Sequence, residues 1–287
     1  METFLQTIAN SLMASGSYAL MAVGLVLIFG VMGIINLAHG ELYMVGAYTV
    51  WYTYTVQGWG FLWAVLAAVF LVAALGLLME RALFRPMLDN PLGGLINSIG
   101  VLFILQVLAV KFGGLGSMKY VPISVSGNVS LFGGASISAQ RAAVIVVTVL
   151  MLGLIWFLLM RTKYGWALRA VAEDREAAAL QGISINKTSM MAMGLGSAAA
   201  GLAGAMMAPI VRVHPYMGHE VIITALIVTI VGGMGSLSGA VIAAVLYAFF
   251  STFMTTYVGG TIAQIAGLAL MLVVLVIKPT GIMGRSA

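Results

Sequence analysis

The chain has no cysteine and very little charge. With zero cysteines among 287 residues, disulfide bonds, haem thiolates and iron–sulfur clusters are excluded. Asp, Glu, Lys and Arg make up only 7% of the chain, against roughly 25% in soluble domains. Basic residues do not cluster with aromatic ones, so no nucleic-acid site is expected. The shortage of charge excludes a soluble enzyme.

Long apolar runs take the place of the missing charge. Hydrophobic residues make up 62% of the chain, and the mean hydropathy is +1.11. Ten-residue blocks of alternating hydrophobicity, which mark membrane barrels, are absent, so the spanning elements must be helices. The uncharged runs cover 3–40, 42–79, 90–110, 142–160, 188–211 and 221–277.

These runs predict an all-α protein, a polytopic membrane helix bundle of about eight to nine spans or part-spans with interrupted helices. The longest run, 221–277, must supply three crossings, with breaks near 232–239 and 256–260. Its first piece is too short for a full span, so a half-helix there is the alternative. We expect a single transmembrane domain over 1–287, and no removable signal peptide.

The uneven placement of positive charge indicates the orientation. Five of the thirteen Lys and Arg residues lie in loop 161–187, which the positive-inside rule places in the cytoplasm. Alternation then puts loop 113–140 outside, where short alternating patterns predict a small β-like flap. Arg85, Lys278 and Arg285 fall inside. The N-terminal segment has no Lys or Arg, so its side stays open.

The cytoplasmic loop contains an unusual stretch at 173–182. It opens with four successive charged residues and continues with three alanines. The pattern predicts a helix over 173–181, with acidic residues in its first turn and Gly182 as its C-terminal cap. Such a slim helix could enter a groove on another protein. An ordinary surface helix is the alternative.

Polar residues also interrupt the first apolar run, at 30–41. Asn36, His39 and Glu41 follow two glycines there. Polar groups at membrane depth are costly and usually face a cavity or the protein interior. They could line a path at a broken helix. Equally, they could form hydrogen bonds between helices and only hold the bundle together.

Two other glycine-containing segments have simpler explanations. Gly196, Ala200 and Gly204 recur every four residues, which predicts close helix packing at the centre of the fold or at a subunit interface. The turn at 232–236 lacks the Gly-Lys-Ser/Thr sequence of a phosphate loop, so we expect a chain break there. The glycine interruptions near 30–40 and 232–239 fall in opposite halves of the chain, which hints at an internal repeat.

No catalytic residue, metal site or cofactor is expected. The three histidines have no local partner pattern such as Gly-x-Ser-x-Gly or His-Glu-x-x-His. Segment 212–220 holds two histidines, an arginine and a glutamate at an expected external helix end. A solvated rim explains that group better than a metal site does. An intramembrane enzyme is therefore the least favoured interpretation.

Several segments together resemble a known family. They include Asn-Leu-Ala-His-Gly-Glu at 36–41 and Pro-Thr-Gly-Ile at 279–282. The full series is 16–20, 29–41, 80–81, 85–86, 99–100, 169–170, 172–174, 182–183, 231–236 and 279–282. In this order the chain resembles the permease subunits of branched-chain amino-acid ABC transporters, specifically the shorter H-type subunit.

The resemblance implies an ABC importer permease in a bacterial inner membrane, which hydrolyses nothing itself. Such permeases carry Glu-Ala-Ala, three residues and Gly in a cytoplasmic loop that docks into the ATPase subunit. Glu176-Ala177-Ala178 followed by Gly182 match that spacing, whereas the Ile-x-Leu-Pro tail of some permeases is missing. The residues that the resemblance assigns to ATPase coupling are Glu173, Asp174, Glu176, Ala177, Ala178 and Gly182.

The resemblance also implies a translocation pathway. Its expected residues are Asn36, His39, Gly40, Glu41, Thr224, Gly232 and Gly233. Thr224 stands near where relatives often carry a Lys. The solute is therefore expected to be a branched-chain amino acid or a similar small polar solute, with urea and short amides open.

The implied partners are ABC ATPase subunits, a periplasmic solute-binding protein, a second permease subunit and membrane lipid. The binding protein is expected to meet loop 113–140 and the rim at 212–220. The second permease could be a copy of this chain or a longer paralogue. The alternative function is a secondary transporter or channel for a small solute such as urea or amides.

Overall fold

The computed structural model describes residues 2–114, 117–130 and 136–284. In this part of the chain, seven helices are long and apolar enough to cross a membrane, and Met217–Gly232 is a shorter apolar helix. This confirms the predicted all-α membrane bundle of about eight to nine spans or part-spans. Arg285 lies outside the described residues, as do parts of loop 113–140.

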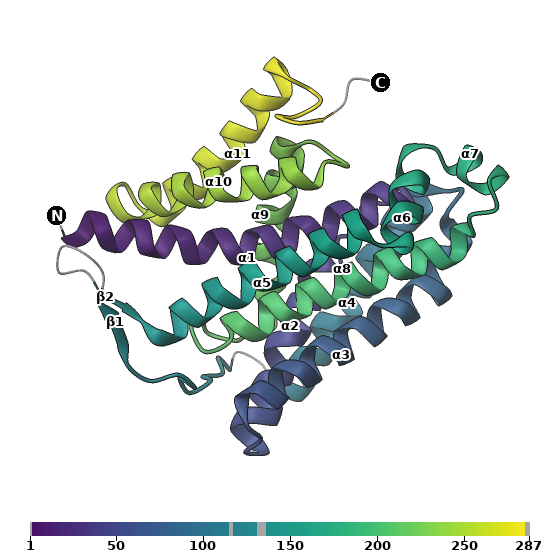
Figure 1. The fold of residues 1–287 in the computed structure, drawn as a ribbon. Coiled ribbons are helices and arrows are strands. Elements are labelled where there is room, and N and C mark those ends of the chain that lie inside the picture. The colour runs from purple at the N-terminus through teal and green to yellow at the C-terminus, as the bar shows by residue number, and fades with distance from the viewer. Residues whose placement is uncertain (1, 115–116, 131–135, 285–287) are drawn as a thin grey trace.

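The helices follow one another in the order shown in Figure 1. The long ones are α1 (Glu2–Met32), α3 (Phe61–Met79), α4 (Pro91–Gly113), α5 (Ala139–Arg161), α8 (Ile185–Met207), α10 (Leu237–Tyr257) and α11 (Gly260–Ile277). The shorter ones are α2 (His39–Val50), α6 (Lys163–Glu173), α7 (Arg175–Leu180) and α9 (Met217–Gly232). Two short π-helices, η1 (Trp51–Val56) and η2 (Glu80–Phe84), and one 3-10 helix, η3 (Arg85–Met87), extend or connect these helices. Strands β1 (Asn128–Ser130) and β2 (Ser136–Ser138) pair antiparallel.

Local sequence fixes where several helices begin. Five residues before helix starts each accept a hydrogen bond, 2.9–3.4 Å long, from the backbone N–H three residues further on. These side chains occupy the position where Ser, Thr, Asp and Asn satisfy the free N–H groups of a helix end. The capping residues are Asn90, Ser138, Thr162, Asp174 and Ser236.

Helices α1 and α8 form the centre of the bundle. They run in opposite directions and meet through backbone at two glycines (Figure 1). A Cβ at Gly24 would lie 2.8 Å from the Gly196 carbonyl oxygen, and a Cβ at Gly196 would lie 2.7 Å from that of Gly24. Ala200 is fully buried and Gly204 lies against the backbone of Tyr43 on α2. The predicted close packing of this small-residue helix at the centre is confirmed.

The packing relates two halves of the chain. Helix α1 packs against α9 and α10, whereas α8 packs against α2 and α3, and the short helices α2 and α9 cross each other. Because α1 and α8 are antiparallel, α1–α3 and α8–α10 are similar arrangements in opposite orientations. The hint of an internal repeat is therefore supported, but its expected pairing is wrong. The interruption at 30–41 corresponds to the α8–α9 connection at 208–216, not to 232–239.

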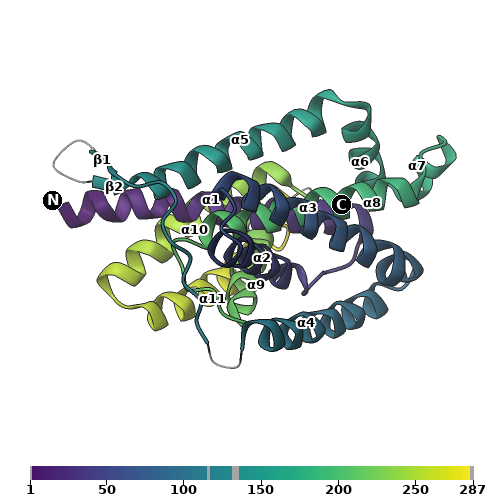
Figure 2. The same cartoon turned by 90° about the horizontal axis from the view of Figure 1, so that it is seen from below.

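Different elements lie at the two ends of the bundle. The β1–β2 hairpin, which confirms the predicted β-like flap in its described part, lies beside the N-terminal end of α1 (Figure 2). There, Arg141 Nη1 donates a 2.6 Å hydrogen bond to Asn10 Oδ1. Helices α6 and α7 lie at the other end of α1. The positive-inside rule predicts a cytoplasmic loop 161–187, and this prediction would put the N-terminal end of α1 outside.

The charged segment at 173–182 differs in detail from the prediction. Glu173 ends α6, and Asp174 is extended (φ −151°, ψ 112°) and caps a separate six-residue α7. A single helix over 173–181 is therefore wrong, because the Asp174 side chain binds the Ala177 N–H and starts a new helix. Gly182 has φ +82°, and the Ile183 N–H bonds the Ala178 carbonyl at 3.1 Å. The predicted glycine cap is confirmed.

A glycine substitution tests the central packing. At Gly46 on α2, a Cβ would lie 2.9 Å from Gly201 Cα on α8, so Gly46→Ala forces the two helices apart. We expect a loss of about 1–3 kcal/mol of stability, seen as a lower midpoint of thermal unfolding in detergent. Gly153→Ala on α5 is the control, because nothing lies within 4 Å of its Cβ position. Equal midpoints for both variants would contradict the packing.

Candidate functional site

The break between α1 and α2, residues 33–38, packs against α4. Gly33 opens the break with φ +67°, a conformation that glycine adopts without strain. Ser98 on α4 accepts a 3.1 Å hydrogen bond from the Leu37 backbone N–H. Gly94, one turn earlier, lies so close to Ile34 that a Cβ there would be 2.7 Å from that side chain. The break is therefore packed against α4.

The polar residues around the break are fully buried. Asn36, His39 and Glu41 each have 0% exposure. His39 Nε2 donates a 3.2 Å hydrogen bond to the Met21 carbonyl on α1. Glu41 Oε1 accepts a 3.0 Å hydrogen bond from Gln106 Nε2 on α4. His39 and Glu41 each link α2 to a neighbouring helix, which is what bracing residues do.

Asn36 differs from these two residues. Its side-chain oxygen and nitrogen are both buried, and neither has a hydrogen-bond partner in the described part of the chain. An unpaired buried polar group costs about 1–3 kcal/mol. An amide offers both a donor and an acceptor. His39 Nδ1 and Glu41 Oε2 are also buried without a partner in the described part of the chain, but Asn36 is the one of the three whose side-chain polar atoms are all unpaired.

The start of α2 crosses the start of α9 at a pair of glycines. A Cβ at Gly218 would lie 2.6 Å from the Gly40 carbonyl oxygen and 2.8 Å from the carboxyl carbon of Glu41. A Cβ at Gly40 would lie 2.8 Å from that of Ile222. Neither glycine position has room for a side chain. The predicted pathway residue Gly40 therefore lies at a helix crossing, directly beside Glu41.

Thr224 lies further along α9, on a different part of its surface. The side chain is half-buried, and its hydroxyl donates a 3.3 Å hydrogen bond to the Glu220 carbonyl of the same helix. The adjacent Ile223 is 38% exposed. Thr224 is therefore on the border between the bundle interior and an open face of α9.

Gly232 and Gly233 form the turn from α9 to α10. A Cβ at Gly233 would lie 2.9 Å from the Thr280 carbonyl oxygen, and the Ile282 N–H donates to the Val231 carbonyl at 2.8 Å. The C-terminal tail is thus fastened onto this turn. The turn is about 21 Å along α9 from its crossing with α2. The structure does not bring the predicted pathway residues together, but divides them among the break, the middle of α9 and this turn.

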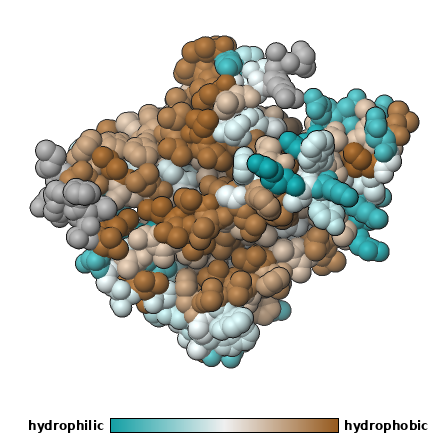
Figure 3. All heavy atoms as spheres, viewed as in Figure 1, coloured by the Kyte–Doolittle hydropathy of each residue, from teal (hydrophilic) through white to brown (hydrophobic). Residues whose placement is uncertain are grey.

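Helix α7 presents one face away from the bundle. Ala178 is buried, whereas Glu176 and Ala177 are exposed and Leu180 is 90% exposed. Figure 3 shows hydrophilic residues gathered around the end of the molecule that carries α6 and α7, while the flank between the two ends is mostly hydrophobic. A leucine this exposed, away from the apolar flank, is a candidate contact for another protein.

No sequence pattern indicated the inward partners of this loop. Arg175, the first residue of α7, donates hydrogen bonds to the carbonyls of Leu88 at 2.9 Å and Val31 at 3.1 Å. Gln106, the partner of Glu41, was also not singled out. The concentration of positive charge identified the loop that contains Arg175, but only the fold shows which carbonyl groups Arg175 bonds.

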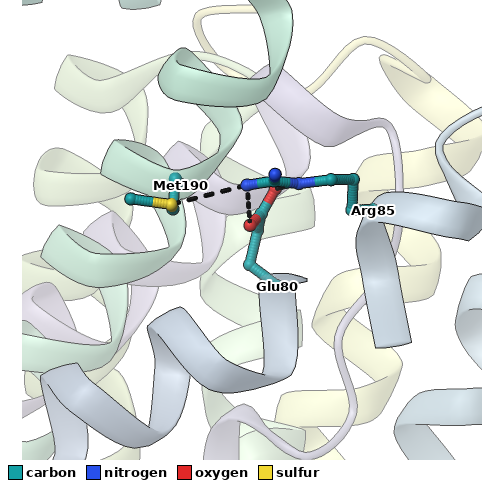
Figure 4. A network of polar contacts seen from close by, with 3 residues as sticks. All are labelled: Glu80, Arg85 and Met190. Atoms are coloured by element: carbon teal, nitrogen blue, oxygen red, sulfur yellow. Dashed lines mark hydrogen bonds and ion pairs between the residues drawn. The ribbon is translucent and has the colours of Figure 1, made fainter. Parts of the chain in front are cut away.

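A second arginine fastens the same end of the bundle. Arg85 Nε and Nη2 donate to the two carboxylate oxygens of Glu80 at 3.1 and 2.8 Å, and Glu80 is fully buried (Figure 4). Arg85 Nη2 also lies 3.4 Å from Met190 Sδ on α8. This group connects the end of α3 to the start of α8. Two-point contact of this kind fixes both position and orientation.

The two predicted external contact segments are joined to each other. Lys119, in loop 113–140, exchanges two backbone hydrogen bonds with Val213, at 2.8 and 3.0 Å. Arg212 lies over the Tyr120 ring and the Lys119 ammonium over the Trp51 ring. The loop and the rim at 212–220 therefore form one surface. Within the described residues, no group of His, Cys, Asp and Glu could hold a metal ion.

The fold and these features define a polytopic membrane permease with a charged loop at one end. Residues 7–278 match the family described as "Branched-chain amino acid transport system / permease component". The chain belongs to this family. As a permease component it is not an enzyme, because ATP hydrolysis in such ABC systems resides in a separate subunit. The family implies ATPase and binding-protein partners.

Named relatives match almost end to end. The permease protein BraD of the high-affinity branched-chain amino acid transport system of Pseudomonas aeruginosa is 31% identical, over 98% of this chain and 96% of its own length. LivH of Escherichia coli, with the same description, is 30% identical with the same coverage. A probable LivH of Methanocaldococcus jannaschii is 28% identical, over 96% of this chain and 91% of its own. The chain is accordingly a multi-pass membrane protein homologous to bacterial inner-membrane permeases.

A solved structure has the same fold. A chain in PsaBC from Streptococcus pneumoniae, in complex with Fab, superposes with a TM-score of 0.53 at 15% identity. The match covers 94% of this chain and 91% of that one. At this identity the likeness concerns the fold alone.

The Glu41–Gln106 hydrogen bond can be tested by a double-mutant cycle. Gln106→Leu or Glu41→Leu alone leaves one buried polar group unpaired, at a cost of about 1–3 kcal/mol each. The double variant removes both groups, so we expect its loss to be clearly smaller than the sum of the two. Thermal unfolding in detergent measures the three variants against the parent. Strictly additive losses would show that the bond contributes nothing.

Proposed function

We propose that this chain forms part of the translocation pathway for branched-chain amino acids in an ATP-driven importer, and that loop 161–187 docks the ATPase. The observation that best supports docking at this loop is that α7 exposes one of its faces. Its outer face offers Glu176, Ala177 and Leu180, while Asp174 and Gly182 fix its two ends. A short helix with both ends fixed can enter a groove without losing much conformational freedom.

In this proposal the docking residues have different roles. Glu176, Ala177 and Leu180 contact the ATPase, because they are exposed. Asp174 and Gly182 set the length of α7, and the buried Ala178 packs it onto the bundle. Glu173 ends α6 and marks the corner between the two helices.

We assign the solute pathway to the region around the break between α1 and α2. The Asn36 amide supports this, because it can donate to a carboxylate and accept from an ammonium group, and an amino acid carries both. His39 and Glu41 brace α2 beside it, and Gly40 allows α9 to approach. Interrupted helices near the middle of a transporter commonly form such sites.

A second permease subunit, a copy or a paralogue, would complete the pathway. Ile35 in the break is 36% exposed and Ile223, next to Thr224, is 38% exposed. Two exposed isoleucines beside polar residues favour cover by another protein chain. By contrast, the broad apolar faces of α4, α5 and α11 suit lipid. The Gly232–Gly233 turn would then mark the inner end of the path.

On the opposite side we place the solute-binding protein on the surface made by loop 113–140 and the rim at 212–220. The Lys119–Val213 pairing supports this, because it joins both segments into one platform. The cationic side chains of Lys119 and Arg212 sit over aromatic rings there. The charge of this platform suits an acidic surface on the binding protein.

The docking role predicts a specific effect at Gly182. Gly182→Asp puts a side chain on a residue with φ +82° and distorts the end of α7. We expect the tagged chain to lose its co-purifying ATPase, and uptake to fall by about tenfold or more. Leu180→Asp should act in the same way, because an aspartate does not fit an apolar groove.

Gly58→Asp is the matched control for this experiment. Gly58 also has a positive φ, +72°, and open space around it, but it follows η1 at the other end of the bundle. The control should keep the ATPase bound. If Gly182→Asp and Leu180→Asp both retain the ATPase and uptake, docking at α7 is wrong. A chain that recruits no ATPase at all would favour a secondary transporter or channel.

Uptake competition tests the proposed substrate. In vesicles containing the assembled transporter, we expect unlabelled isoleucine and valine to suppress uptake of labelled leucine, and urea and acetamide to leave it unchanged. The named relatives support this choice, whereas Thr224 in place of the lysine expected from the resemblance leaves a different solute open. If urea suppresses leucine uptake and isoleucine and valine do not, the substrate is assigned to urea and short amides instead.

A further inference from the structure

We propose that Arg175 is the residue that transmits movement of the ATPase-docking helix to the break between α1 and α2. This inference rests on the proposed docking of the ATPase at α7. It names a positioning residue that neither the Glu-Ala-Ala pattern nor the polar interruption at 30–41 includes.

Arg175 is the positively charged residue of loop 161–187 whose side chain packs against the helix bundle. Loop 161–187 contains five Lys and Arg residues. Four of them are exposed, whereas Arg175 is half-buried. The exposed residues are Arg161, Lys163, Arg169 and Lys187. A cytoplasmic loop needs positive charge for orientation, but orientation does not require any of it to be buried. The inward position of Arg175 therefore points to a different role.

The partners of Arg175 are carbonyl groups at the ends of two other elements. Nη2 bonds the Val31 carbonyl in the last turn of α1, and Nη1 bonds the Leu88 carbonyl just after η3. Carbonyls at a helix end have no partner within their own helix. A planar guanidinium can bond two acceptors at once in a fixed geometry. One side chain thus joins α7 to α1 and to the α3–α4 connection.

The contact lies immediately before the break. A Cβ at Gly33 would lie 3.9 Å from Arg175 Nη2, so the guanidinium lies over the first residue of the break. A Cβ at Gly30 would lie 3.7 Å from the Ala172 Cβ of α6. The end of α1 is thus in contact with both α6 and α7. Asn36, with its unpaired amide, follows only three residues after Gly33.

The α3–α8 contact near loop 161–187 is held by a different group of residues. Glu80, Arg85 and Met190 connect the end of α3 to the start of α8, and Glu80 is fully buried (Figure 4). That connection does not involve α7. A shift of α7 on the ATPase would therefore act on α1 through Arg175, while α3 and α8 remain joined. The expected moving part is the end of α1 with residues 33–38.

The experiment uses the assembled transporter with its ATPase and binding protein in proteoliposomes. Arg175→Met keeps the length of the side chain but removes both hydrogen bonds. We expect the ATPase still to co-purify, because Glu176, Ala177 and Leu180 are unchanged. Solute transported per ATP hydrolysed should fall by about tenfold, the size expected for losing charge-assisted hydrogen bonds. Arg161→Met removes the same charge from an exposed position and should transport normally.

A cysteine reporter makes the test independent of folding. The chain has no cysteine, so Ile35→Cys, at a position 36% exposed, gives one reactive site in the break. With Arg175 present, its maleimide labelling rate should differ between nucleotide-free and vanadate-trapped states. In the Arg175→Met background, the two rates should be equal. If Arg175→Met does not assemble, Arg175→Lys is used, which keeps the charge and loses the two-point geometry; it should still reduce transport per ATP.

The outcomes separate this inference from the docking proposal. If the parent chain recruits no ATPase, docking fails and Arg175 has nothing to transmit. If the ATPase binds, but Arg175→Met or Arg175→Lys transports as many solutes per ATP as the parent, the inference is overturned. A labelling difference that persists without Arg175 would overturn it equally.

Discussion

Contact between glycine backbones is the constraint on which the rest of the structure depends. Gly24 and Gly196 bring α1 and α8 together at the centre, and Gly40 and Gly218 let α2 and α9 cross. In a membrane, apolar side chains gain little by leaving lipid for a neighbouring helix, so close backbone packing has to supply much of the association. These contacts hold the two oppositely oriented halves of the chain against each other.

The glycine crossing explains why polar groups can sit so deep in an apolar bundle. Because α9 approaches the start of α2 through Gly218, it covers the Glu41 carboxyl, while Gln106 supplies a hydrogen bond from α4. His39 Nε2 likewise bonds a carbonyl of α1. Asn36 is left with unused hydrogen-bonding capacity. The start of α2 is thus braced from α1, α4 and α9 beside an amide with no partner in the described part of the chain.

The sequence predicted what depends on length and composition. Apolar runs predicted the helices and Gly182 predicted a helix end, because each of these is a local property. It did not predict contacts between distant segments. Arg175 and Val31 are 144 residues apart, and Gln106 and Glu41 are 65 apart. The expected correspondence between the two halves was wrong for the same reason. The glycine interruptions at 30–41 and 232–239 look alike in sequence, but the helix contacts make 33–38 the equivalent of 208–216 in the other half.

We propose that the break between α1 and α2 moves with the ATPase while the glycine crossing beside it stays fixed. Amide hydrogen exchange on the assembled transporter tests this most directly, with and without trapped nucleotide. We expect a change in exchange for peptides covering 29–38 and none for those covering the crossing at 40–46 and 217–222. Unchanged exchange at 29–38, or an equal change in both regions, would contradict it.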